Sequence, residues 1–147
     1  LPLPGRQLVV AVDESVKYDC NEGEKRVWLI DIREERNPVI VSSCPVPEGD
    51  FCKRGLRFGP HNVHEMRPGS YQNENLIFVT YYNAGLRVFD IRNKFSPEEV
   101  GFFIPPAPEG QNAPMFNDLY VDTDGLIYVS DRIKGGLYIL EYTGPKI

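Results

Sequence analysis

Several features that would assign this sequence to a common protein class are missing. No apolar run approaches the roughly 18 residues that a membrane-spanning helix needs. Positive charge is scarce too, because 16 Lys and Arg stand against 21 Asp and Glu, a formal net charge of −5. Binding to nucleic-acid phosphates requires an excess of positive charge. The sequence therefore predicts neither a membrane span nor a nucleic-acid partner.

Catalytic signatures and metal-binding cysteine pairs are also absent. The chain has no Gly-x-Ser-x-Gly nucleophile elbow, no P-loop and no Gly-x-Gly-x-x-Gly turn before a helix. Its three cysteines, Cys20, Cys44 and Cys52, include no Cys-x-x-Cys pair, so a zinc site built on cysteines is not expected. Two interpretations stay open: the cysteines are free thiols, or Cys44 and Cys52 form a disulfide across the loop between them.

The composition that is present favours a globular β protein. Hydrophobic residues make up 41% of the 147 residues, which is typical of a chain that folds around a core. Glycine and proline number 13 each, and no segment keeps a helical period of about 3.6 residues. We therefore expect an all-β fold with almost no helix.

Two strand-like patterns recur along the chain. Residues 27–32 match 86–91 and again 137–142, and the strand at 8–12 recurs at 76–80 and 126–130. Short strands rich in Val, Ile, Phe and Tyr that repeat every 50–60 residues or so are typical of β-propeller blades. A β-sandwich with chance internal similarity is the alternative.

Each repeat unit is expected to hold up to four antiparallel strands, which we label A to D from the innermost outward. The three units span approximately residues 8–47, 58–106 and 115–147. Strand A is expected at 62–65 and 118–121, and strand D at 39–42 and 99–103. The first unit then lacks its innermost strand, and the last lacks its outermost strand.

The second and third units resemble a known family. Residues 84–91 read Ala-Gly-Leu-Arg-Val-Phe-Asp-Ile, Pro97 and then Glu99-Val100-Gly101 follow, and residues 135–142 repeat the pattern. This pattern resembles the LVIVD repeat of bacterial β-propeller proteins. The resemblance implies propeller blades, and because many such proteins look exported, it implies an extracytoplasmic location, either secreted or periplasmic. It implies no particular activity.

Three units are too few for a closed propeller, which has about four to eight blades. An open arc exposes strand edges that promote aggregation. We therefore expect residues 1–147 to form a partial β-propeller that another polypeptide completes. Because the chain starts at Leu1 and not at Met, we expect that polypeptide to be another fragment of a longer propeller. A second copy of the chain, which makes a six-bladed ring, is the alternative.

Candidate functional residues lie where strand A enters its unit. His61 and Asn62 align with Asn117 and Asp118 of the next unit, and Glu65 follows closely. Because strand A is innermost in a blade, the first four side chains are expected to form a polar ring at the mouth of the central channel, with Glu65 nearby as a further candidate for ligand binding.

The two histidines of the chain, His61 and His64, are three residues apart. In a regular strand they lie on opposite faces, so they are not expected to bind one ligand together. We expect His64 to pack between units, because it aligns with a tyrosine.

Two functions fit these patterns. The first is a binding or scaffold module that presents the polar channel mouth to a ligand or partner. The second is a metal-assisted hydrolase or oxidase with a divalent metal held by His61 at the channel entrance. Because the chain has only two histidines, such a metal would need ligands from outside the chain.

Overall fold

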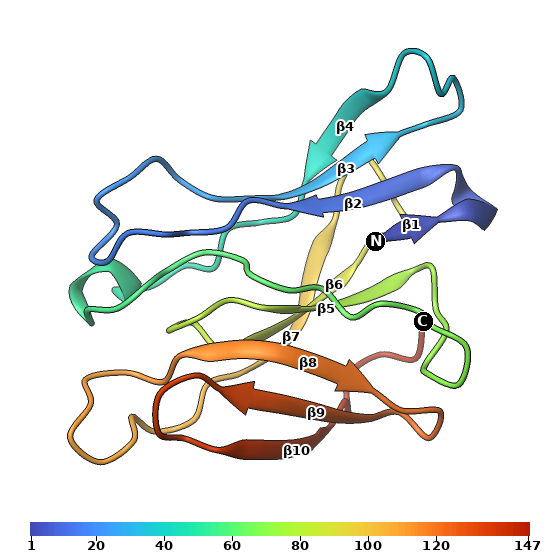
Figure 1. Ribbon diagram of the computed structural model, residues 1–147. Helices are drawn as coiled ribbons and strands as arrows, with labels where there is room; N and C mark the ends of the chain where they lie inside the picture. The colour runs from blue at the N-terminus through green and yellow to red at the C-terminus, as the bar shows by residue number, and fades with distance from the viewer.

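The computed structural model describes residues 1–147 and is built almost entirely of β-strands (Figure 1). The strands are β1 (Pro2–Leu3), β2 (Leu8–Val12), β3 (Val27–Asp31), β4 (Val39–Ser43), β5 (Leu76–Thr80), β6 (Leu86–Asp90), β7 (Glu98–Phe103), β8 (Phe116–Val121), β9 (Leu126–Asp131) and β10 (Leu137–Glu141). Two single turns of 3-10 helix, η1 (Pro4–Arg6) and η2 (Phe51–Lys53), complete the fold. The prediction of an all-β chain is confirmed. No helix has the length and apolar character needed to cross a membrane.

The strands form three antiparallel sheets that follow one another along the chain. The first sheet has the order β1-β2-β3-β4, the second β5-β6-β7 and the third β8-β9-β10. Figure 1 shows the second sheet lying between the other two. The three sheets form a stack, and they do not close into a barrel.

The sequence repeat is also a repeat of strand pairing. In each sheet, the first residue of one strand pairs with the last residue of the next strand along the chain. These pairs are Leu8↔Asp31, Leu76↔Asp90 and Leu126↔Glu141. A register shift also falls at equivalent places in the first two sheets, between Leu29 and Ile30 and between Val88 and Phe89, whereas the shift in the third sheet falls between Phe116 and Leu119. The sequence repeat is therefore a repeat of the pairing in all three sheets and of the register shift in two of them.

The second sheet is buried on both faces. All five residues of β5 are buried, and alternate side chains point to opposite sides of the sheet. Ile77 and Val79 join a core with the first sheet, whereas Leu76 and Phe78 join a core with the third. Each core therefore lies between two neighbouring sheets.

The expectation that the first unit lacks its innermost strand is wrong. Pro2 and Leu3 form β1 and pair with Val9 and Leu8, so the first sheet has four strands. A two-residue strand is too short to show an alternating pattern. Proline is tolerated in it because β1 is an edge strand.

The expected innermost strand of the second unit is not a regular strand. The segment 58–64 runs beside β5 and shares backbone hydrogen bonds with Thr80 and Phe78, but its pairing is limited to the isolated bridges Phe58↔Tyr82 and Val63↔Val79. Proline at position 60 has no N–H to donate, and the Thr80 hydroxyl replaces part of the ladder by accepting from the Asn62 backbone N–H at 3.1 Å. In the third unit the outermost strand is absent, as predicted, because the sheet ends at β10.

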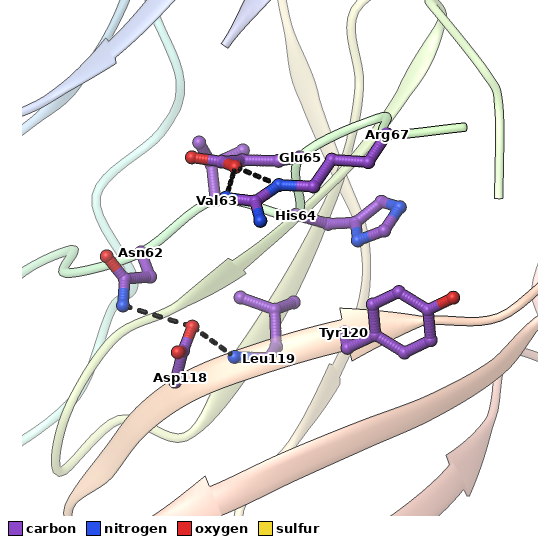
Figure 2. A pocket seen from close by; sticks show the side chains of 8 residues that line it. All are labelled: Asn62, Val63, His64, Glu65, Arg67, Asp118, Leu119 and Tyr120. Atoms are coloured by element: carbon purple, nitrogen blue, oxygen red, sulfur yellow. Dashed lines mark hydrogen bonds and ion pairs between the residues drawn. The ribbon is translucent and has the colours of Figure 1, made fainter. Parts of the chain in front are cut away.

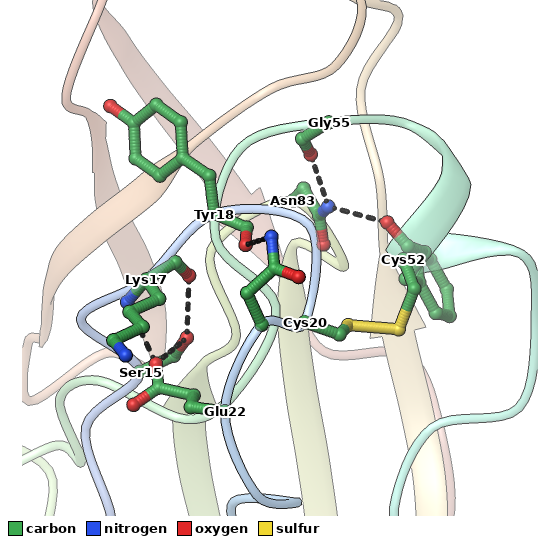
Figure 3. The surroundings of a disulfide bond; sticks show 10 residues. Ser15, Lys17, Tyr18, Cys20, Glu22, Cys52, Gly55 and Asn83 are labelled. Atoms are coloured by element: carbon green, nitrogen blue, oxygen red, sulfur yellow. Dashed lines mark hydrogen bonds between the residues drawn. A yellow bond between two sulfur atoms is a disulfide. The ribbon is translucent and has the colours of Figure 1, made fainter.

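The predicted Cys44–Cys52 disulfide is wrong, and the free-thiol interpretation holds for Cys44 alone. Cys20 and Cys52 form a disulfide across 32 residues (Figure 3), and Cys44 is a free, buried thiol. Cys44 directly follows β4 and packs in the core between the first two sheets. The short spacing from Cys44 to Cys52 was misleading, because sequence spacing alone does not show which loops meet.

The two repeat-equivalent glycines Gly85 and Gly136 provide a matched test of packing. Both have left-handed backbones, with φ of 78° and 77°. A Cβ at Gly85 would overlap the backbone oxygen of Phe103, whereas a Cβ at Gly136 meets nothing within 4 Å. We expect Gly136→Ala to lower the free energy of unfolding by about 1–2 kcal/mol. Gly85→Ala should lower it by about 2–5 kcal/mol, because overpacking adds to the backbone strain. Urea denaturation measures both, and equal losses would contradict the expectation.

A second prediction concerns the disulfide. Cys20→Ser should lower the free energy of unfolding by about 3–4 kcal/mol, because the unfolded chain regains the entropy of a loop of this length. A reducing agent should cause the same loss in the wild type and in Cys44→Ala, and should leave Cys20→Ser unchanged. Denaturation curves with and without the reductant check this, and a wild type that does not respond to the reductant would refute it.

Candidate functional site

The segment 61–64 places its side chains alternately toward the two neighbouring sheets. The His61 N–H donates to the Thr80 oxygen, and the His64 N–H donates to the Phe78 oxygen, so the segment runs antiparallel to β5. His61 lies on the side of the first sheet, near Glu14, whereas His64 contacts Val121 of β8. The prediction that the two histidines face opposite ways is confirmed.

His61 belongs to a network of polar side chains centred on the hydroxyl of Tyr82. That hydroxyl donates to Oε1 of Glu14 at 2.7 Å and lies 2.9 Å from Nδ1 of His61. The Arg57 guanidinium donates both to the Tyr82 hydroxyl and to the Glu14 carboxylate, each at 3.2 Å. The His61 ring also stacks on the Tyr82 ring, with centroids 4.7 Å apart.

The donors of this network determine the tautomer of His61. A carboxylate only accepts, so the Tyr82 hydroxyl uses its proton on Glu14. The hydroxyl oxygen must then accept from His61, which places the imidazole proton on Nδ1. Nε2 of His61 is left with a lone pair that no hydrogen bond within the chain uses, and the side chain keeps 16% of its surface exposed. It is available as a hydrogen-bond acceptor, a base or a metal ligand.

Burial keeps the network in this protonation state. It lowers the pKa of His61 below its ordinary value, an effect that the Glu14 carboxylate opposes and that Arg132 and Arg57 reinforce. Burial likewise raises the pKa of Tyr82 to about 12, and its hydrogen bond to Glu14 acts in the same direction. At neutral pH the imidazole is therefore neutral and the phenol keeps its proton.

The residues around His61 come from equivalent positions in all three sheets. Glu14, Tyr82 and Arg132 each lie two residues beyond the matched strand ends at Val12, Thr80 and Ser130. The same loop position therefore supplies a carboxylate, a phenol and a guanidinium near His61; the charge of Glu14 raises the pKa of His61 and the charge of Arg132 lowers it.

Tyr82 is held in a strained conformation. Its φ of 45° is in the left-handed region, which bulky residues rarely adopt. Backbone bridges to Phe58 on one side and to Phe116 on the other hold it there. Strain of this kind persists only where the surroundings enforce it, and it is frequent at functional sites.

Two loops bring Glu14 and Arg57 to Tyr82, and the disulfide joins them (Figure 3). Oε1 of Glu22 accepts from the Ser15 hydroxyl and from the backbone N–H groups of Val16 and Lys17, which folds the loop 13–26 on itself. These bonds lower the pKa of Glu22 to about 2. The buried Asn83 amide donates to the Phe51 and Gly55 oxygens and fixes the opposite loop.

Asn62 and Asp118 form a second polar group beside this network. The Asn62 amide donates to the Asp118 carboxylate at 3.1 Å, which joins the segment 61–64 to β8 (Figure 2). The Thr80 hydroxyl donates to the Asn117 backbone oxygen at 2.7 Å and strengthens the same junction. The side-chain oxygen of Asn117 is buried without a partner. Four of the five predicted site residues, His61, Asn62, Asn117 and Asp118, therefore lie at this junction.

Glu65 lies apart from the other predicted residues. It is exposed and forms an ion pair with Arg67 (Figure 2). Glu65, Asn62 and Asp118 all line a cavity of about 380 Å³ between residues 62–67 and β8, whereas His61 does not line it.

His64 has a structural role. Its Nε2 donates to the Tyr71 oxygen at 3.1 Å, and its Nδ1 accepts from the Val121 N–H at 3.2 Å. Both ring nitrogens are used, the residue is buried, and burial lowers its pKa. His64 thus joins the second and third sheets, as expected from its alignment with a tyrosine.

The chain alone does not assemble a metal-binding group. No cluster of three or more His, Cys, Asp or Glu side chains is arranged to hold an ion. Oε1 of Glu14 lies 3.5 Å from Nδ1 of His61, but it already accepts from Tyr82 and Arg57. A metal at the free Nε2 of His61 would need its other ligands from outside this chain.

Sequence reasoning did not select Glu14 or Tyr82 as site residues. Glu14 begins a long loop with no counterpart in the other units, and Tyr82 is one of two adjacent tyrosines. Aligning the residues that follow the three matched strands would have found both. Comparison with known protein families, with curated protein sequences and with solved structures finds no match to this chain.

The network predicts the titration of both histidines. Because burial lowers the pKa of His61 and His64, the folded chain binds fewer protons than the unfolded chain just below pH 6.5. Stability should therefore be highest above that pH and fall as the pH drops below it. Glu14→Gln should lower the pKa of His61 further and leave that of His64 unchanged.

Proton–nitrogen correlation spectra measure the pKa and the tautomer of each ring together. We expect the proton of His61 on Nδ1 and the proton of His64 on Nε2. A His61 pKa above 6.5, or the same tautomer in both rings, would be inconsistent with the network.

Proposed function

We propose that this chain is an arc of β-propeller blades of the LVIVD-repeat type that acts as a binding or scaffold module. The polar junction at the inner strands is its ligand-binding mouth. The observation that carries the proposal is the network around Tyr82, which leaves Nε2 of His61 neutral and without a hydrogen-bond partner on a partly exposed side chain.

The arrangement of the sheets supports blades as the repeating unit. Three sheets with the same strand pairing stack face to face, and their first strands or segments, β1, 58–64 and β8, occupy the same place in each sheet. Propeller blades are short antiparallel sheets stacked in this way around an axis. With three units and no closure, the ring requires another polypeptide, either a further fragment or a second copy.

The chemistry of the mouth indicates the class of ligand. Nε2 of His61 and the free oxygen of Glu14 accept hydrogen bonds, while the guanidinium of Arg57 donates them. A small polar ligand with both hydroxyl or amino donors and an acceptor group fits this set. Tyr82 is fully buried and supports the His61 ring from behind by stacking on it.

The disulfide supports an extracytoplasmic location. Structural disulfides persist in oxidising compartments and are rare in the cytosol. Cys20–Cys52 joins the two loops that carry Glu14 and Arg57, so the mouth as described depends on that bond.

The alternative function is a metal-assisted hydrolase or oxidase. The lone pair on Nε2 of His61 favours it, because a neutral imidazole is a common metal ligand. The remaining ligands would then come from the polypeptide that completes the ring.

A ligand screen by nuclear magnetic resonance tests the binding module. Panels of polyols, amino acids and small carboxylates are added to the labelled chain, and Zn²⁺ and Mn²⁺ are added separately. We expect the amide signals of Glu14, His61 and Tyr82 to shift together with a polar small molecule. Shifts confined to other regions, or none with any probe, would refute the proposal, and shifts with a metal alone would favour the enzyme.

Tyr82→Phe provides the matched variant for this screen. It removes the hydroxyl that holds Glu14 and orients His61, so affinity for the ligand should fall by about 10-fold. Tyr128→Phe is the control, because it removes a hydroxyl that bonds to the remote Asp122. Equal affinity of the two variants would show that the network does not bind the ligand.

A further inference from the structure

The outer face of the third sheet carries exposed apolar side chains that nothing covers, with Glu141 and Ser130 at its margins. Leu137 and Ile139 of β10 are 62% and 59% exposed, and Leu126 of β9 is 37% exposed. Tyr128 lies on the same face, since Tyr128 pairs with Ile139 and Leu137 pairs with Ser130 across the two strands. Exposed apolar side chains gathered on one sheet face mark an interaction surface.

The internal repeat shows what this face is built to contact. Its residues are equivalent to residues of the second sheet that already pack against a neighbour. The equivalent pairs are Leu126 with Leu76, Tyr128 with Phe78, Leu137 with Leu86 and Ile139 with Val88. All four residues of the second sheet belong to the core shared with the third sheet. The outer face of the third sheet therefore repeats the face of the second sheet that packs against the third sheet.

The first sheet carries a matching face at the other end of the stack. Its outer residues Val9, Ala11, Trp28 and Ile30 are partly exposed, and Ile40 on β4 is 56% exposed. Val9 and Ala11 are equivalent to Ile77 and Val79, which receive the first sheet in the existing core. The outer face of the first sheet thus repeats the face of the second sheet that packs against the first sheet.

We propose that the outer face of the third sheet docks onto the outer face of the first sheet of a second copy of this chain. The contact repeats the packing of the second sheet on the third. This proposal rests on the proposed function and identifies the completing polypeptide as a second copy of the chain. One chain carries both faces, but its own second sheet lies between them. They therefore meet only between copies.

This contact is head to tail, because two different faces meet. Heterologous contacts of this kind close into a ring when the rotation fits. Two copies give six sheets, which is within the range of closed propellers of about four to eight blades. The ring would also bring a second set of polar loops to the same axis.

Charged substitutions on the two faces test the proposal. Ile139→Glu changes the third sheet, and Ile40→Lys changes the first. Both side chains are exposed, so the fold should survive, and circular dichroism verifies it. Phe95→Lys is the control, because Phe95 is 67% exposed and belongs to the turn between β6 and β7 of the second sheet, not to a strand of either face.

Light scattering gives the mass of each species. We expect wild type and Phe95→Lys at twice the 16.7 kDa of one chain, and each face variant alone at 16.7 kDa, with dimerisation weakened about 30-fold or more. An equimolar mixture of the two face variants should recover the double mass, because one unaltered third-sheet face and one unaltered first-sheet face remain.

Three results would overturn the proposal. The first is a monomeric wild type, and the second is a face variant that keeps the double mass. The third is a mixture of the two face variants that stays monomeric, which is the result expected if each face bound the same face of another copy. The ligand screen on the monomeric variants then tests the mouth separately, because Glu14, His61 and Tyr82 belong to one chain. Failure of the docking is thereby distinguished from failure of the binding function.

Discussion

The burial of the second sheet on both faces is the constraint on which the rest of the structure depends. A strand such as β5, with all five residues buried, is stable only if another layer covers each side. The first and third sheets supply those layers, and each leaves an apolar face of its own uncovered. Because the same repeat builds all three sheets, the outer faces of the first and third sheets carry the same kind of apolar side chains as the covered faces of the second sheet.

Most of the fold could be predicted from the sequence. Short alternating strands recur with matched turns, so β2 to β10 fall where the repeat places them. β1 was missed because two residues show no period, and its stability comes from pairing with β2. The segment 62–65 was expected as a strand, but a neighbouring proline and the Thr80 hydroxyl interrupt its ladder. That the stacked sheets are propeller blades stays a prediction.

The candidate site was only partly predictable, because its contacts join loops that are distant in sequence. His61, Asn62 and Asp118 were identifiable as polar residues at strand entries. Glu14 reaches Tyr82 across 68 residues, and Cys20 reaches Cys52 across 32, so no local pattern records either contact. Tertiary packing selects those partners. In the sequence, only the alignment of the loop positions that follow the three matched strands indicates that Glu14 and Tyr82 lie close together.

The long loop 13–26 is an insertion that leaves the pairing of the strands on either side of it unchanged. It replaces a connection that is only five residues long between β5 and β6, yet the register of β2 with β3 is the same as that of β5 with β6. Its length and sequence are therefore free to change without disturbing the sheets, while Glu22 and the disulfide keep it folded. Since this loop delivers Glu14 to His61, exchanging it offers a route, in evolution or in design, to new ligand preferences on an unchanged scaffold.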